Sequence, residues 1–444
     1  MKFAIYTLGC KVNTYESEFM THLFKSKGYK QVDYKDKADI YIINTCTVTN
    51  TSDNKSKKII NHTRELNPNS IIIVCGCFTQ YMKGDISNKD KVDIIIGNKD
   101  KSKIVDLLED YLKEKNKVTK IYDLKKQNFE DMEIKKFESH TRAFVKIQDG
   151  CNNFCSYCII PYVRGNVRSK KLESVIKEVN NLVKNGHREV VLTGIHTGHY
   201  GSDINSNLTK LLKELSKIDE LKRIRISSIE ITELTDEFLN ELENNKLIVD
   251  HMHIPLQSGT DKTLKAMNRK YDTKYFYEKI CKIREIRPDI SITTDVIVGF
   301  PDETDADFNK TVEFIKKVNF SKLHVFPYSK RNGTVAASMK NQIDGKIKKD
   351  RAHTLLELSK KLENDYYNKF INSDVEVLIE RCKDNKYIGH TSNYLEVEIE
   401  SNKDITNQLY MVHINEIIDN KCIGKLKEGG KINEKNNDNF SCLC

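Results

Sequence analysis

The stretch Asp149-Gly150-Cys151-Asn152-Asn153-Phe154-Cys155-Ser156-Tyr157-Cys158 places three cysteines in the spacing C-x-x-x-C-x-x-C. Thiols this close in sequence can converge on one metal centre. A structural zinc site and a 4Fe-4S cluster each normally take four protein ligands, so three thiolates leave one coordination position open. The alternatives are a zinc knuckle completed by a remote histidine, and buried thiols that bind no metal. The loop glycine, the spacing and the aromatic residue before the third cysteine favour a cluster with an open iron.

The cysteine loop resembles that of the radical S-adenosylmethionine (SAM) enzymes. In that family the open iron of a 4Fe-4S cluster binds the amino and carboxylate groups of SAM. An electron from the cluster then cleaves SAM to a deoxyadenosyl radical, which abstracts hydrogen from an unactivated C–H bond. The resemblance implies that Cys151, Cys155 and Cys158 hold the cluster and that Tyr157 lies near the adenine of SAM.

Length and composition indicate a large, reduced protein. The chain has 444 residues, 38% of them hydrophobic, which is enough for two or three domains with separate cores. Twelve cysteines would suggest disulfides in a secreted protein. The N-terminus runs straight into a predicted strand without signal-peptide architecture, so we expect reduced thiols that serve as ligands in a cytoplasmic protein. No run approaches the roughly 18 apolar residues that span a bilayer, so we expect no membrane partner.

The formal net charge is +9, from 73 Lys and Arg against 64 Asp and Glu. This modest excess fits a polyanionic partner without requiring one. Residues 371–444 carry 9 basic and 13 acidic side chains, so the basic excess lies entirely within residues 1–370. A biased genome composition is the alternative explanation for the many lysines.

Residues 1–115 alternate between predicted strands and helices. We expect strands at residues 2–8, 39–44, 70–74 and 92–96, and helices at residues 14–27, 53–66 and 101–113. This alternation predicts an α/β domain with a small flavodoxin-like parallel sheet and helices on both faces.

Three cysteines of this domain follow the carboxyl ends of predicted strands, where open parallel sheets bind their ligands. Cys10, Cys46 and Cys77 are therefore candidates for a second set of three thiolates. Cys75 is an alternative to Cys77, but Gly76 before Cys77 suits a sharp turn. Cysteines that pack as small hydrophobic side chains are the other interpretation, which their placement in loops after strands weakens.

A charged, weakly patterned stretch, residues 116–139, is expected to connect this domain to a second series of strands and helices. Six strands are predicted within residues 140–369, at residues 143–148, 189–193, 223–227, 251–256, 291–298 and 322–326. They predict a partial parallel β/α barrel in which the cysteine loop follows the first strand and the chemistry lies at the strand carboxyl ends.

The last part of the chain changes to short alternating strands at residues 375–379, 394–399 and 409–412. They predict a small antiparallel β-barrel over residues 370–430. Residues 431–444 are polar and are expected to be disordered. Cys442 and Cys444 in this tail form a C-x-C pair, a weak metal-binding signal.

Motifs along nearly the whole chain resemble those of the radical SAM methylthiotransferases. The N-terminal motifs are Thr7-Leu8-Gly9-Cys10-Lys11-Val12-Asn13, Asn44-Thr45-Cys46-Thr47-Val48-Thr49 and Gly76-Cys77-Phe78. Residues 371–427 look like the TRAM domain of that family, which resembles RNA-binding modules. Further segments are most similar to the branch that acts on threonylcarbamoyladenosine in tRNA: residues 146–151, 192–198, 225–230 and 324–331.

This resemblance implies a second 4Fe-4S cluster on Cys10, Cys46 and Cys77, whose open iron holds or delivers the inserted sulfur. One SAM would methylate that sulfur, and another would yield the radical that removes hydrogen from carbon 2 of the adenine. The expected product is a methylthio group on threonylcarbamoyladenosine next to the tRNA anticodon. The expected partners are the tRNA anticodon stem-loop, a flavodoxin- or ferredoxin-like electron donor and a sulfur donor.

Other functions compete with this one. Within the family, the alternatives are isopentenyladenosine in tRNA and an aspartate of a ribosomal protein. A non-catalytic iron-sulfur or RNA-binding protein would not need an incompletely ligated cluster beside a barrel. The main alternative class is therefore a radical SAM enzyme that acts on protein.

Polar residues at or near the predicted strand ends are candidate SAM contacts, although each could equally satisfy the barrel backbone. They are Gly194, Ser228, Glu230, Gln257 and Asp295, in addition to Tyr157. His196, His199 and His253 are expected to form hydrogen bonds rather than bind metal, because the two cysteine sets already complete the ligands for this chemistry.

Two groups of side chains are candidate tRNA contacts. The first group is basic, with a solvated charged face as the alternative, and comprises Arg164, Arg168, Lys170, Lys171, Lys262, Lys265, Arg269, Lys270 and Lys274. The second group lies in the C-terminal barrel and would read shape or stack on a few bases; it comprises Lys383, Lys386, Tyr387 and Tyr394.

Overall fold

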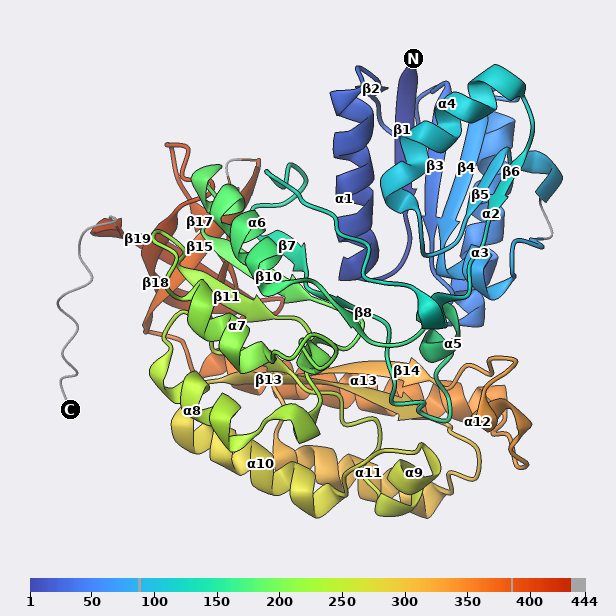
Figure 1. Ribbon diagram of the computed structural model, residues 1–444. Helices are drawn as coiled ribbons and strands as arrows, with labels where there is room; N and C mark the ends of the chain where they lie inside the picture. Colours follow the sequence, from blue (N-terminus) through green and yellow to red (C-terminus); the bar gives the residue numbers. More distant parts are fainter. Residues whose placement is uncertain (87–88, 385, 433–444) are drawn as a thin grey trace.

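The computed structural model describes residues 1–86, 89–384 and 386–432, which form three parts that pack on one another (Figure 1). The N-terminal domain lies above an open barrel of strands and helices, and a small closed β-barrel lies at the side of the open barrel. Within the described ranges, no helix combines the length and apolar character needed to cross a membrane. Cys442 and Cys444 lie outside the described residues.

The N-terminal domain is built on a parallel sheet with the strand order β2-β1-β3-β4-β5-β6. Its strands are β1 (Lys2–Thr7), β2 (Lys30–Gln31), β3 (Ile40–Thr45), β4 (Ile71–Gly76), β5 (Ile94–Ile96) and β6 (Val118–Lys120). Its helices are α1 (Lys11–Ser26), α2 (Asn50–Leu66), α3 (Cys77–Tyr81) and α4 (Ile104–Glu114). This order confirms the flavodoxin-like prediction. The short strands β2 and β6 were not expected, because two or three residues leave no readable periodicity.

The stretch predicted as a connection, residues 116–139, is integrated into the fold. Its strand β6 pairs with β5 and extends the sheet of the N-terminal domain. Met132, Ile134 and Phe137 are buried in the core of the open barrel. Each of these side chains is flanked by charged residues, which hides the apolar signal in the sequence.

The open barrel consists of two three-stranded parallel sheets, ordered β11-β10-β7 and β12-β13-β14. An isolated bridge joins Ile224 of β11 to Ile248, which precedes β12 in the chain. The strands are β7 (Ala143–Lys146), β10 (Glu189–Thr193), β11 (Arg223–Ile226), β12 (His251–His253), β13 (Ser291–Val298) and β14 (Lys322–Pro327). All six predicted strands are confirmed, and the barrel is partial because β7 and β14 are not paired.

Helices cover the outside of this barrel (Figure 1). They are α6 (Leu172–Lys184), α7 (Leu208–Leu215), α8 (Asp236–Asn244), α9 (Asp261–Ala266), α10 (Thr273–Ile286), α11 (Asp305–Val318), α12 (Val335–Ser338) and α13 (Gly345–Asn368). Shorter elements flank the cysteine loop: β8 (Gln148–Asp149), α5 (Ile160–Arg164) and β9 (Arg168–Ser169).

The C-terminal part is a closed barrel with the order β15-β16-β17-β19-β18, which confirms the predicted small barrel; its strands pair antiparallel except for β17 and β19, which are parallel. Its strands are β15 (Asp374–Lys383), β16 (Lys386–Thr391), β17 (Glu396–Glu400), β18 (Leu409–Ile418) and β19 (Lys421–Lys431). The last strand includes Lys431, the first residue of the predicted disordered tail. Two ion pairs dock this barrel on the open one: Arg223 with Glu376 at 2.8 Å and Arg142 with Glu380 at 2.9 Å.

Candidate functional site

The three N-terminal cysteines meet at the carboxyl edge of the parallel sheet. Cys10 immediately precedes α1, Cys46 follows β3, and Cys77 is the first residue of α3. A Cβ atom built on Gly9 would lie 3.2 Å from the sulfur of Cys46, so the first two loops are in contact. Burial and the nearby thiols of Cys77 and Cys10 raise the pKa of Cys46 to about 11. The three thiols are therefore near enough to affect one another electrostatically.

Cys75 has different surroundings from this group. It lies in β4 and packs in the core of the sheet beside Ile73. Burial raises its pKa to about 12. Gly76 adopts a φ of +105°, and a Cβ atom there would lie 2.5 Å from the carbonyl oxygen of Thr45. This glycine therefore allows the sharp turn that brings Cys77, rather than Cys75, to the edge of the sheet.

The second set of cysteines lies in a loop whose base is closed by the antiparallel strands β8 and β9. Gly150 starts the loop with a φ of +77°, and a Cβ atom there would lie 1.9 Å from the carbonyl oxygen of Asn166. The three cysteine residues of the loop are intermediate between buried and exposed. Burial and the two neighbouring thiols raise the pKa of Cys158 to about 12.

The donor chemistry of both sets fits a 4Fe-4S cluster. All six cysteines are free, and thiolates are the soft ligands that iron-sulfur clusters take. Nε of Arg164 lies 3.2 Å from the sulfur of Cys77, and Nη1 of Arg269 lies 3.2 Å from the sulfur of Cys155. Cations this close favour thiolates and the negative charge of a cluster.

Arg164 is fully buried and links the two cysteine sets. Its Nη1 donates to Glu16 at 2.7 Å and lies 3.2 Å from a carboxylate oxygen of Asp149, at the start of the second cysteine loop. Its Nη2 donates to Asn13 at 2.8 Å, and its Nε faces Cys77. One guanidinium group thus touches the surroundings of both sets.

Glu16 is the anionic centre of this buried network. Its carboxylate also pairs with Lys101 from the N-terminal domain and, at 2.8 Å, with Lys146 from β7 of the open barrel. Burial would raise the pKa of Glu16, but Arg164, Lys101 and Lys146 lower it well below its usual value. The charged contacts of one carboxylate therefore hold the two domains together.

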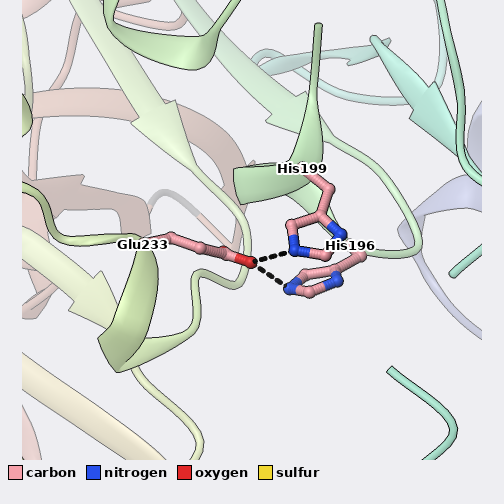
Figure 2. Close-up of side chains that lie close together, drawn as sticks. All are labelled: His196, His199 and Glu233. Carbon is pink, nitrogen blue, oxygen red and sulfur yellow. Dashed lines mark ion pairs between the residues drawn. The ribbon is translucent and has the colours of Figure 1, made fainter. Parts of the chain in front are cut away.

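His196, His199 and Glu233 form a compact group beside Cys151 (Figure 2). Nε2 of both imidazoles points at one carboxylate oxygen of Glu233, with His199 at 3.2 Å and His196 closer. Nδ1 of His196 lies 3.6 Å from the sulfur of Cys151. Burial would lower the pKa of His196, but hydrogen bonds to Cys151 and Glu233 raise it to about 10.

The spacing of this group would also suit a metal ion. Nε2 of each imidazole pairs with one carboxylate oxygen of Glu233. The hydrogen-bonding role expected for these histidines stays a prediction.

The candidate SAM contacts lie around the carboxyl ends of the barrel strands. Gly194 follows β10, Ser228 and Glu230 follow β11, Gln257 follows β12, and Asp295 lies within β13. Because the strands are parallel, these positions share one end of the barrel with the loop that follows β7.

Several of these residues already have protein partners. Glu230 accepts a hydrogen bond from Arg269, the residue that also contacts Cys155. Asp295 lies 3.2 Å from Nε2 of His253. Gln257 has a φ of +67°, an uncommon value for a residue other than glycine, and such positions cluster at functional sites. Tyr157 is partly buried, beside Phe300 and Tyr328.

The structure corrects much of the basic group expected to contact phosphate. Arg164, Arg168 and Lys170 are at most 7% exposed, and Lys170 pairs with Glu178 at 2.8 Å. Arg269 is engaged at the cysteine loop, as described above. The exposed members of the group are Lys171, Lys262, Lys265, Lys270 and Lys274. Tyr387 is also unavailable to bases, because it is buried in the core of the C-terminal barrel.

Comparison with known proteins gives the family. Residues 145–315 match the radical SAM superfamily, and residues 2–97 match an uncharacterized protein family, UPF0004. The chain is 43% identical to threonylcarbamoyladenosine tRNA methylthiotransferase MtaB of Bacillus subtilis (strain 168), over 93% of each chain. The chain belongs to the radical SAM methylthiotransferase family. Membership brings SAM and 4Fe-4S clusters as cofactors.

Other relatives of this methylthiotransferase family cover the chain to a similar extent. The MtaB protein of Aquifex aeolicus (strain VF5) is 38% identical over 91% of this chain and 98% of its own length. A tRNA-2-methylthio-N(6)-dimethylallyladenosine synthase of Thermoanaerobacter sp. (strain X514) is 36% identical over 93% of this chain and 90% of its own length.

A solved structure of similar fold is the radical SAM methyltransferase TsrM from Kitasatospora setae, with tryptophan and a SAM analogue bound. It superposes with a TM-score of 0.56 at 14% identity and covers 76% of this chain and 74% of that chain. This likeness concerns the fold alone.

Proposed function

We propose that this methylthiotransferase inserts a methylthio group at carbon 2 of N6-threonylcarbamoyladenosine next to the anticodon of tRNA. The observation that carries the proposal is the 43% identity to a threonylcarbamoyladenosine tRNA methylthiotransferase over 93% of both chains. The two groups of three free thiols support it, since the reaction needs one centre for SAM cleavage and another for sulfur.

We assign the cluster ligands to the two cysteine sets. Cys151, Cys155 and Cys158 would hold the radical SAM cluster; Cys10, Cys46 and Cys77 would hold the auxiliary cluster. Loaded with its clusters and SAM, the site supplies an electron, a methyl group and a group that abstracts hydrogen. The chain itself provides thiolates with one open position in each set, cations beside the sulfurs, and a buried network that fixes their relative placement.

We further assign SAM binding to side chains at the carboxyl end of the barrel. Gly194, Ser228, Gln257 and Asp295 would contact its polar groups, and Tyr157 its adenine. Glu230 would act by holding Arg269, which contacts Cys155 at 3.2 Å. Residues 1–115 and 140–369 would then carry the chemistry, and residues 370–430 would help to bind tRNA.

The partners follow from the reaction. They are the tRNA anticodon stem-loop, a flavodoxin- or ferredoxin-like electron donor and a sulfur donor, all in the cytoplasm. The alternative nucleoside is the dimethylallyl one, because relatives 36% identical to this chain carry that name.

Nucleoside analysis of tRNA tests the proposal. We expect tRNA from cells that lack this chain to lose 2-methylthio-threonylcarbamoyladenosine and to accumulate its precursor. A plasmid copy should restore the product, and a copy with Cys151→Ala should not. Loss of a methylthiolated dimethylallyladenosine instead would assign the chain to the alternative substrate.

A further inference from the structure

A cavity of about 690 Å³ lies where the three parts of the chain meet. Lys11 comes from α1, Arg225 and His251 from the open barrel, and Asn393 and Tyr394 from the C-terminal barrel. The volume lies in the range of small-molecule sites. No single part of the chain encloses it, so a ligand there would contact all three.

Lys11 supplies a positive charge to this cavity. Within the described part of the chain, no carboxylate forms an ion pair with it. Its cationic neighbours are paired, Arg225 with Glu189 at 2.7 Å and Arg142 with Glu380 at 2.9 Å. Lys11 is exposed and lines the cavity, so its ammonium group can reach a ligand there. A ligand carboxylate could form a charge-assisted hydrogen bond with it.

The other two lysines of the cavity wall already have partners. Lys322 lies 2.7 Å from Glu363, and Lys421 lies 3.5 Å from Glu396. Among the lysines that line the cavity, Lys11 alone has no ion pair within the described residues, and it directly follows Cys10 in the chain; the carboxylate of Asp419 lines the cavity as well.

Tyr394 organises this corner. The guanidinium carbons of Arg225 and Arg142 lie 4.7 and 5.2 Å from the centre of its ring, and His251 stacks on it at 4.8 Å. Its backbone has a φ of +72°, which bulky side chains rarely adopt. Strained positions of this kind persist where the surroundings fix them, often at ligand sites. Tyr394 thus lines the cavity with its ring in contact with these three side chains, and its stacking on a base stays a prediction.

His251 adds an unsatisfied polar atom. The residue is 8% exposed, and its Nε2 lies 3.2 Å from the hydroxyl of Thr293. Its Nδ1 is buried and has no hydrogen-bond partner within the part of the chain that the structure describes. Buried polar atoms are usually paired, so an unpaired one in a cavity wall indicates a bound group that completes it.

We propose that this cavity receives the threonylcarbamoyl group of the substrate nucleoside, with its carboxylate on Lys11 and a polar atom of the group on Nδ1 of His251. The inference rests on the proposed function and extends it to substrate choice. Threonylcarbamoyladenosine carries a carboxylate, whereas a dimethylallyl group is apolar and would leave the charge of Lys11 desolvated and unpaired. The same cavity would therefore accept the first nucleoside and reject the second.

Binding of synthetic anticodon stem-loops to the anaerobically reconstituted full chain tests this inference. Three RNAs differ at one nucleoside: threonylcarbamoyladenosine, its methyl ester, and dimethylallyladenosine. We expect the wild-type chain to bind the acid about 10- to 100-fold more tightly than the ester, the range for a hydrogen bond to a charged group. The Lys11→Met variant should bind the acid about 10- to 100-fold more weakly than the wild-type chain does. Its affinity for the ester should change by less than about twofold.

Lys322→Met is the matched control, since this lysine lines the same cavity but is paired with Glu363. It should keep the acid-to-ester ratio. Equal affinity of the wild-type chain for acid and ester would overturn the inference without any variant. An acid-to-ester ratio that persists in Lys11→Met would also overturn it.

Activity separates this inference from the proposed function. If the wild-type chain methylthiolates the acid but Lys11 does not affect its binding, only the carboxylate site is wrong. If the wild-type chain methylthiolates dimethylallyladenosine and not threonylcarbamoyladenosine, the proposed function itself fails.

Discussion

At the scale of a single residue, Arg164 balances the negative charge of its buried neighbours. Two anionic centres are proposed on either side of it, and Glu16 and Asp149 add two buried carboxylates. Its guanidinium contacts both carboxylates and the sulfur of Cys77. Removing one partner from a buried ionic network leaves the others uncompensated, which typically costs about 3–5 kcal/mol.

Arg164→Met should therefore destabilise the chain and lower the reduction potential of the auxiliary cluster, because a nearby cation stabilises the reduced, more negative form. Redox titration followed by electron paramagnetic resonance, in a chain that also carries Cys151→Ala, Cys155→Ala and Cys158→Ala, would measure the potential. Arg351→Met is the control, since this buried arginine pairs with Glu303 at 2.7 Å and contacts no cysteine in the described structure. An unchanged potential in Arg164→Met would show that the contact has no influence on the cluster.

The two neighbouring cysteines of β4 and α3 should behave differently. Anaerobic reconstitution should give about eight irons per wild-type chain and about four in Cys77→Ala. Cys75→Ala should retain about eight, because its side chain packs in the core and not at the edge of the sheet. Iron analysis distinguishes the two, and the reverse result would make Cys75 the ligand.

At the scale of elements, α11 supports the loop that carries Gln257. The hydroxyl of Thr311 accepts a hydrogen bond from the backbone nitrogen of Gly259 at 3.2 Å. The helix begins with a capping box between Thr304 and Asp307, and Lys262 donates to Asp307 at 2.6 Å. The loop that carries a candidate SAM contact is thus tied to α11 by Thr311, and the residue after that loop, Lys262, is tied to the N-terminus of the same helix.

Asp307→Asn should destabilise this helix by about 1–2 kcal/mol at pH 7. Burial would raise the pKa of Asp307, but Lys262 and Thr304 lower it to about 2. A depressed folded-state pKa gives stability that is present above about pH 4 and is lost as the pH falls toward 2. Hydrogen exchange of the α11 amides should thus differ between variant and wild type at pH 7 and converge as the pH falls below 4.

Asp305→Asn is the matched control for that experiment. Its carboxylate lies in the same first turn but is 90% exposed, where a single ion pair contributes little. If both variants open the helix equally at pH 7, general charge at the helix N-terminus and not the capping box would be responsible.

At the scale of the whole molecule, the C-terminal barrel closes the cavity but does not carry the positive charge. Residues 371–444 contain 9 basic and 13 acidic side chains. The exposed lysines of the open barrel, such as Lys265 and Lys274, are better placed to attract phosphate than the C-terminal barrel is. Recognition of the nucleoside and attraction of the tRNA are thereby divided between different parts of the chain.

A chain that ends near Asn372 should keep most of its salt-dependent affinity for tRNA. We expect the slope of log affinity against log salt to change by about one or less, the contribution of one phosphate contact. Methylthiolation should be lost, because Asn393 and Tyr394 no longer line the cavity. Iron analysis checks that the truncated chain still binds clusters. A collapse of the salt-dependent binding would instead make the C-terminal barrel the electrostatic anchor.

The sequence by itself determined the order of the fold and the six proposed ligands. Buried parallel strands are continuous apolar runs, as in Ile40–Thr45, and cysteines placed after such runs must lie at the same edge of a sheet. The spacing of Cys151, Cys155 and Cys158 is local and survives any tertiary arrangement. Secondary structure and motifs of this kind depend on neighbours in the chain, so they are readable without coordinates.

Only the tertiary structure decided what the charged residues do. Arg164, Arg269 and Lys170 look like phosphate contacts in the sequence, yet each is buried against partners such as Glu16, which lies 148 residues from Arg164. The cavity around Lys11 is likewise assembled from three separate parts of the chain. The role of a charged side chain cannot be read from the sequence, because burial and pairing decide it. They determine whether the charge stabilises the fold, favours the thiolate form of a nearby cysteine or binds a ligand.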